Sequence, residues 1–197
     1  MCRPTSGASM RRREFIKLLA AAGVASPLPA HAQQPERTRR VSVLMALAEG
    51  DPVAQAQLTA FQKELNRLGW TEGRNIRIDY RWAAAAPDRM RAYAAELVQM
   101  TPDVIVANSP PVLAAVQQQT RTIPIVFVQI VDPVRSGFIQ SLAKPGGNAT
   151  GPTEYEFAMG GKWLELLKEI APAISRVAVI LMPEHVTNAG LYRAIEA

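Results

Sequence analysis

The chain has 197 residues, 48% of them hydrophobic and 20% charged, a composition that suits a folded domain and excludes an intrinsically disordered one. The formal charge is +5, but residues 1–32 hold five of the 22 basic and one of the 17 acidic residues. The rest of the chain therefore carries a net charge of only +1, which gives no support for a nucleic-acid or acidic-lipid partner. The single cysteine, Cys2, also lies in this segment, which excludes a disulfide, a thiolate nucleophile and a cysteine metal site from the rest of the chain.

Residues 1–32 have the three parts of a secretory signal: a charged segment, a short apolar segment and a small-x-small cleavage site. The paired arginines resemble the bacterial twin-arginine (Tat) signal, and we expect cleavage after Ala32, with either Met1 or Met10 as the start. The alternative, an N-terminal helix of the domain, is disfavoured because Pro27 and Pro29 break helices. The residues expected to carry the signal are Arg12, Arg13, Phe15, Lys17, Ala30 and Ala32.

The first predicted strand is the apolar run 41–47, which is typical of a strand buried on both faces. Asp51 and Pro52 then supply an N-cap and a first-turn proline to a helix with one apolar stripe, which ends at Gly69. Residues 75–80 alternate apolar and polar side chains, which predicts a half-exposed strand near the sheet edge.

A second helix is predicted from Pro87, and a third strand at 103–107. The sequence Ser-Pro-Pro then begins a helix over 109–119. The fourth strand is predicted at 123–130, with Pro124 at its start, where a missing N–H donor is tolerated.

Beyond this strand, the pattern predicts a short helix at 134–142 and a glycine-rich turn region at 144–151. A helix at 161–170 and a fifth strand at 176–182 follow, and a last helix begins near Thr187 and still continues at the end of the chain.

Alternating strands and helices predict an α/β fold, with a parallel sheet flanked by helices and right-handed crossovers. We expect a linker at 33–39, an N-terminal ligand-binding lobe at 40–155, and a hinge helix with the start of a second lobe at 156–197. Because the last helix is still continuing at residue 197, we expect this second lobe to be incomplete.

Ligands of open parallel sheets bind beyond the carboxyl ends of the strands, where the candidate residues are Asn108, Ser109, Asp132 and Thr150. A helix that begins after Ser109 attracts a carboxylate or phosphate, although Ser109 could equally be a plain N-cap. Asp132 precedes a proline and could be a turn former instead. No metal or cofactor is expected, because the two histidines cannot form a metal site and a dinucleotide-binding glycine fingerprint does not follow the first strand.

Several segments together resemble the ABC-transporter substrate-binding proteins of the tryptophan/tyrosine-binding type. These segments are residues 65–75, 122–127, 132–134, 145–151 and 161–168. The resemblance implies a type I periplasmic-binding-protein-like fold, in which two α/β lobes close on an amino-acid-like solute, with Asn108, Ser109, Asp132 and Thr150 in the cleft. The sequence departs from the family at Pro111, which removes one N–H donor, and family members continue well beyond residue 197.

We therefore expect a periplasmic, non-enzymatic, monomeric solute receptor that feeds ABC permease subunits in the inner membrane. The alternatives are an exported cofactor-dependent oxidoreductase, because folded cofactor enzymes use the Tat pathway, and a non-functional fragment of a binding protein. A sugar-repressor core with the same fold would require an N-terminal pair of DNA-binding helices, and a signal peptide stands there instead.

Overall fold

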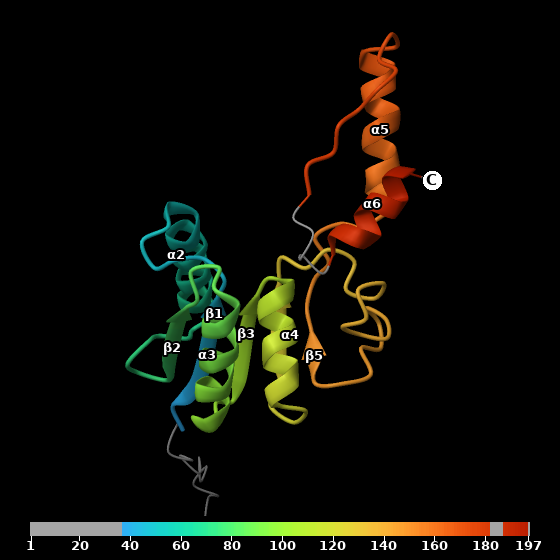
Figure 1. Ribbon diagram of the computed structural model, residues 1–197. Helices are drawn as coiled ribbons and strands as arrows, with labels where there is room; N and C mark the ends of the chain where they lie inside the picture. Colours follow the sequence, from blue (N-terminus) through green and yellow to red (C-terminus); the bar gives the residue numbers. More distant parts are fainter. Residues whose placement is uncertain (1–36, 182–186, 197) are drawn as a thin grey trace, which may run out of the picture. The chain divides into compact units, whose positions relative to one another are not determined.

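The computed structural model describes residues 37–181 and 187–196, so the predicted signal peptide lies outside the described residues. Five parallel strands form one sheet in the order β2-β1-β3-β4-β5 (Figure 1). The strands are β1 (Arg39–Met45), β2 (Ile76–Trp82), β3 (Val104–Asn108), β4 (Ile125–Val128) and β5 (Ala149–Thr150). The helices are α2 (Pro52–Arg67), α3 (Pro87–Gln99), α4 (Pro110–Gln119), α5 (Met159–Ile170) and α6 (Asn188–Glu196). The predicted α/β class with a parallel sheet is confirmed.

Helix α2 begins and ends where the sequence predicts. The Asp51 carboxylate accepts the N–H groups of Val53 and Ala54 at 2.8 and 3.2 Å, which satisfies two of the free donors at this helix end. After the last turn Gly69 takes a φ of 87°, and the N–H of Trp70 donates to the Leu65 carbonyl at 2.9 Å. This left-handed glycine closes the helix and turns the chain toward β2.

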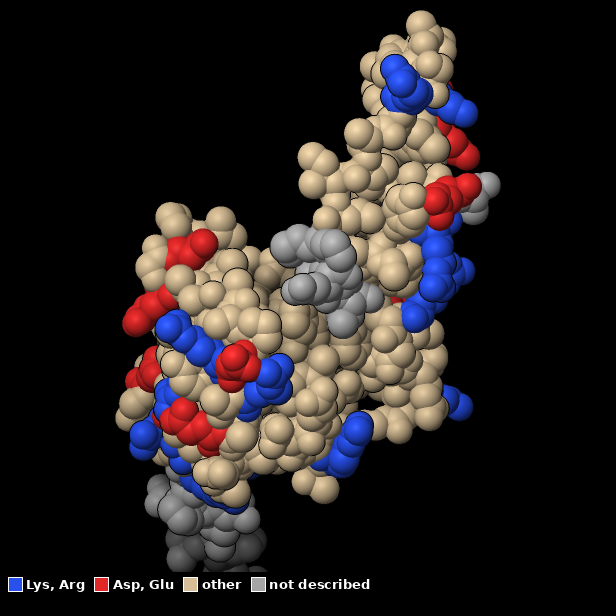
Figure 2. Space-filling model, in the orientation of Figure 1, with Lys and Arg blue, Asp and Glu red and all other residues tan. Residues whose placement is uncertain are grey.

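The two faces of the sheet are covered unequally. Helices α3 and α4 pack on one face, where Leu97, Ile105, Leu113 and Phe127 are fully buried. On the other face α2 packs on β1 and β2, around a smaller buried cluster that includes Ala54. Over α3, Lys and Arg side chains lie among Asp and Glu side chains (Figure 2), which agrees with the near-balanced charge of the chain after residue 32.

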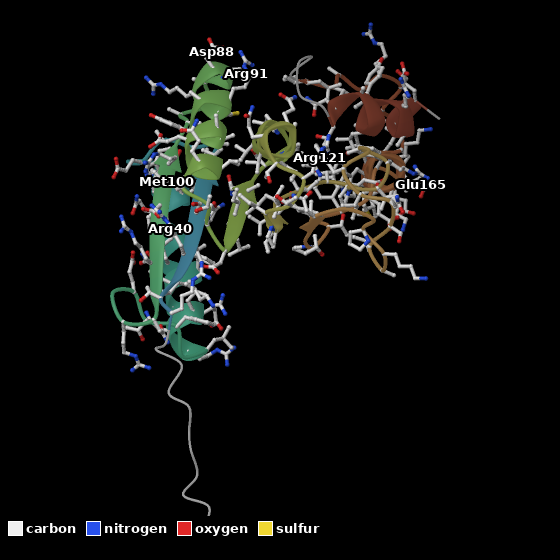
Figure 3. All side chains as sticks on the ribbon, turned by 90° about the horizontal axis from the view of Figure 1, so that it is seen from below. Arg40, Asp88, Arg91, Met100, Arg121 and Glu165 are labelled. Carbon is white, nitrogen blue, oxygen red and sulfur yellow. The ribbon has the colours of Figure 1, made fainter. Side chains whose placement is uncertain are left out.

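Arg40, near the start of β1, joins this strand to the middle of β2 and to the segment before β3. Its Nε donates to the Asp79 carboxylate at 2.6 Å, and its Nη1 donates to the Met100 carbonyl at 3.2 Å (Figure 3). Its backbone N–H donates to the Asp103 carboxylate at 2.8 Å. The hydrogen bond from Arg40 lowers the pKa of Asp79, and the backbone N–H of Arg40 lowers the pKa of Asp103.

Two predicted elements are wrong. Residues 134–142 form turns and not a helix: the N–H of Ser136 donates to the Asp132 carbonyl at 2.9 Å, and Gly137, with a φ of 79°, then leaves the helical region. The described part of the predicted strand 176–182 has no regular secondary structure, is mostly exposed and pairs with no described strand. A parallel strand requires a hydrogen-bonded neighbour, and none of the described strands lies beside this segment.

The glycine-rich region contains a short strand, β5, that was not predicted. Ala149 and Thr150 pair with Ile125 and Val126, so β5 extends the sheet beyond β4. Gly151 permits this pairing, because a Cβ at this position would lie 2.1 Å from the Phe127 carbonyl oxygen.

None of the helices in the described ranges is long and apolar enough to span a bilayer.

Candidate functional site

Residues with a left-handed backbone gather at the carboxyl ends of the strands. Ser109 follows β3 with a φ of 102°, Gln129 follows β4 with a φ of 57°, and Asp132 has a φ of 41°. Such strain in non-glycine residues concentrates at ligand sites, because packing must hold it in place. The predicted candidates Asn108, Ser109 and Asp132 thus lie at this edge of the sheet, where parallel α/β sheets bind ligands.

Asn108 joins three elements through its side-chain amide. It is 4% exposed, and its Nδ2 donates to Oε1 of Gln129 beyond β4 and, at 3.4 Å, to Oε1 of Gln57 on α2. Neither glutamine is among the site residues predicted from the sequence. Gln129 could have been found because it directly follows the apolar run of the fourth strand, whereas the helical pattern around Gln57 gives no signal.

Ser109 is not a side-chain N-cap. Its backbone N–H donates to the Val128 carbonyl at 3.1 Å, which ties β3 to β4, but its hydroxyl makes no capping bond to α4. The Oγ atom is buried and has no hydrogen-bond partner among the described residues, so the helix begins beside an unsatisfied polar atom.

The start of α4 offers few backbone donors. Pro110 and Pro111 have no N–H, and the N–H of Leu113 already donates to the Ser109 carbonyl at 3.0 Å. The first helical amide left for a ligand is therefore that of Val112. A ligand bound here would be held by the Ser109 hydroxyl and this single amide.

Asp132 is a structural element of the turn after β4. One carboxylate oxygen accepts the N–H of Arg135 at 3.0 Å and the other accepts the N–H of Phe157 at 3.2 Å. The backbone N–H of Asp132 also donates to the Tyr155 carbonyl at 2.9 Å. This geometry favours the turn-forming interpretation, and a ligand contact by Asp132 stays a prediction.

Thr150 lies further from this edge than the sequence suggested. It pairs with Val126, two residues before the end of β4, whereas Thr153 pairs with Ile130 just beyond that end. Thr153 also lines a hollow of about 260 Å³ with Asp132, Arg135 and Glu156. Among the described residues there is no group of three or more His, Cys, Asp or Glu side chains that could hold a metal ion.

Comparison with known proteins places this geometry in a family. Residues 40–192 match the family described as ABC transporter substrate binding protein. The tyrosine-binding protein of Clostridioides difficile (strain R20291) is 34% identical over 128 residues, which are 65% of this chain and 36% of that protein.

Solved structures are similar to this chain in fold, and two of them also in sequence. A conserved domain protein from Vibrio cholerae is 30% identical with a TM-score of 0.73, over 81% of this chain and 53% of that one. The ligand-free, open structure of a Clostridium difficile substrate-binding protein with adhesive properties is 30% identical, with a TM-score of 0.62. The match covers 80% of this chain and 52% of that one. A Streptococcus pneumonia protein solved with L-Trp shares the fold, with a TM-score of 0.70 and 20% identity. The match covers 80% of this chain and 52% of that one. The chain thus spans about a third to a half of the length of these relatives, and it belongs to the family of ABC transporter substrate-binding proteins.

Proposed function

We propose that this chain is the solute-binding component of an ABC import system and binds a small amino-acid-like solute at the carboxyl edge of its sheet. The observation that carries the proposal is the buried, unpartnered Ser109 hydroxyl at the edge where this family's fold would place a ligand. The relatives supply the solute class, since one is named as tyrosine-binding and another was solved with L-Trp.

The solute's carboxylate would lie at the start of α4. It would accept hydrogen bonds from the Ser109 hydroxyl and the Val112 amide, where the partial positive charge of the helix end also favours an anion. Asn108 would contribute its Oδ1, which can accept a hydrogen bond only from a donor of the solute such as its ammonium, because Nδ2 donates to Gln57 and Gln129.

The solute's ammonium would face Asp132, beside Thr153. A carboxylate has about four acceptor sites; two backbone N–H groups occupy two of them, and Arg135 Nε also lies 3.8 Å from Oδ2, so an ammonium would share the carboxylate with this guanidinium.

Calorimetry with L-tyrosine and L-tryptophan tests the site. Loss of one charge-assisted bond costs about 1.5–3 kcal/mol, so Ser109→Ala should weaken binding roughly tenfold to a hundredfold. Ser42→Ala is the matched control, because Ser42 Oγ is also buried and unpartnered but lies within β1, away from the carboxyl edge. Tyramine, which lacks the carboxylate, should bind wild type no better than tyrosine binds Ser109→Ala. Equal affinities of wild type and Ser109→Ala would place the site elsewhere.

We also propose that residues 1–32 direct Tat export to the periplasm, where the chain would meet its permease. Replacing Arg12 and Arg13 with lysine should abolish export, because the planar guanidinium pair and not its charge alone is recognised. The measurement is the periplasmic yield of the double variant, and a yield equal to that of wild type would contradict the proposal.

A further inference from the structure

Asn108, the last residue of β3, is held by the strands on both sides. In the parallel register it lies beside Met45 of β1 and Val128 of β4, and it is 4% exposed. The sheet therefore fixes the place of this side chain and leaves open the rotation of its terminal amide. The two orientations of the amide exchange an acceptor oxygen for a nitrogen with two donors, so they offer a bound molecule opposite chemistry.

Two glutamines determine which orientation the amide takes. Nδ2 of Asn108 donates to Oε1 of Gln129 and, at 3.4 Å, to Oε1 of Gln57, so both of its hydrogens are engaged. In the described part of the chain, no residue donates to Asn108 Oδ1, and the fully buried side-chain atoms without a partner are Ser42 Oγ and Ser109 Oγ. Because Asn108 Oδ1 is not one of these buried atoms, this unpaired acceptor is open to a bound molecule.

The backbone of Gln129 is shaped to make its contact with Asn108. Successive side chains of a strand point to opposite faces of a sheet, so Gln129 is expected on the face opposite to Val128. Instead, both residues line the same hollow as Asn108. The left-handed φ of 57° at Gln129 lets the chain leave β4 with this side chain on the Asn108 face. Such a backbone is unfavourable for a residue other than glycine and persists where contacts hold it.

Gln57 brings the second acceptor from α2. Ala54 lies three residues earlier, on the same side of the helix, and is fully buried against the sheet. This packing holds Gln57 beside Asn108. The amide of Asn108 is thus fixed from a helix and from a neighbouring strand end, and its orientation does not depend on one contact alone.

We propose that Gln129 and Gln57 are specificity-determining positioning residues, which hold Asn108 Oδ1 toward the solute and make the site select solutes with an ammonium beside their carboxylate. The inference rests on the proposed function, because it takes the carboxylate to lie at Ser109. In an α-amino acid both charged groups are attached to one carbon, so two consecutive residues can meet them. The Ser109 hydroxyl donates to the carboxylate, and Asn108 Oδ1 accepts from the ammonium. An ammonium has three donors, so Asp132 can accept another.

Calorimetry of the full chain with two ligands isolates this effect. L-Tyrosine and 3-(4-hydroxyphenyl)propionate share the ring and the carboxylate, but the second has no ammonium. Gln129→Met keeps the length of the side chain and removes the acceptor, so it should weaken tyrosine about tenfold and change the affinity for the propionate by no more than about twofold. Gln57→Met should act in the same way but more weakly, because its contact is the longer one.

Gln62→Met is the matched control. Gln62 lies on the same helix as Gln57 and its Nε2 donates to the Tyr80 hydroxyl at 3.2 Å, but it lines a different hollow from Asn108. The affinities for both ligands should therefore be those of wild type. Far-UV circular dichroism of each variant establishes that the fold is retained.

A double-mutant cycle tests whether Gln129 acts through Asn108. In an Asn108→Ala background, Gln129→Met should cause no further loss of tyrosine affinity, whereas a general structural role would weaken both ligands in either background. If wild type and Gln129→Met bind tyrosine with the same preference over the propionate, the inference is overturned and the proposed function stands. If neither ligand binds wild type, both are refuted.

NMR of the ligand-free chain gives a second readout. The side-chain NH2 signals of Asn108, identified by their loss in Asn108→Ala, should exchange slowly with solvent in wild type and quickly in Gln129→Met, because the hydrogen bond protects them. Rapid exchange in wild type would overturn the fixed orientation of the amide, whatever the ligands do.

Discussion

The carboxylate of Asp132 holds the turn after β4, and we expect Asp132→Ala to destabilise the chain by about 4–7 kcal/mol. Its two oxygens accept the backbone N–H groups of Arg135 and Phe157 at 3.0 and 3.2 Å, and a hydrogen bond to a charged group contributes about 1.5–3 kcal/mol. The residue is 6% exposed, so water cannot readily replace the lost acceptors. Alanine would also have to adopt a φ of 41°, which costs about 1 kcal/mol more.

Asp132→Asn should cost about half as much, because asparagine keeps one acceptor oxygen and tolerates the left-handed region. The assay is urea unfolding near neutral pH, followed by circular dichroism. Asp88→Ala is the control, since Asp88 is exposed on α3 and pairs only with Arg91 (Figure 3), and its loss should change the unfolding free energy by no more than about 0.5 kcal/mol. A cost below about 1 kcal/mol for Asp132→Ala would refute the structural role and leave Asp132 as a ligand contact alone.

Three further predictions concern other parts of the fold. The hydrogen bond from Arg40 lowers the pKa of Asp79 below its ordinary 3.8. The stability that this pair contributes is therefore present above pH 3.8 and is lost as the pH falls through the lower folded pKa. On acidification, the free energy of unfolding should fall less steeply in Asp79→Asn than in wild type. Gly151→Ala should cost about 1–3 kcal/mol or more because of the contact with the Phe127 carbonyl, whereas Gly147→Ala, with nothing within 4 Å of its Cβ, should show no clash in thermal unfolding. Ile180→Lys, at a position 97% exposed, should leave stability within about 0.5 kcal/mol but slow aggregation in light scattering; an unchanged aggregation rate would contradict the prediction.

The sequence predicts best those elements whose signals are local. The cap at Asp51, the apolar stripe that follows it and the alternation at 75–80 each require only neighbouring residues, and the structure confirms α2 and the edge strand β2. The turns at 134–142 were mistaken for a helix because the apolar spacing there is helical. Gly137 and the hydrogen bonds of Asp132 determine the backbone instead.

The candidate site was predictable only in its location. The rule that ligands meet the carboxyl ends of parallel strands selected Asn108 and Ser109, and both lie there. The rule gives no account of how their side chains are engaged. The amide contacts of Gln57 and Gln129 depend on the packing of α2 over the sheet, and the lack of a partner for the Ser109 hydroxyl depends on its φ of 102°.

The failure of the predicted strand at 176–182 and the exposed apolar side chains of α5 have one physical origin. A helix satisfies its own backbone hydrogen bonds, so α5 can form before anything covers its apolar side. A parallel strand must find its hydrogen bonds on a neighbour, so the apolar run at 176–181 forms no strand where no described strand lies beside it. Both segments therefore present apolar side chains that no other described residue covers.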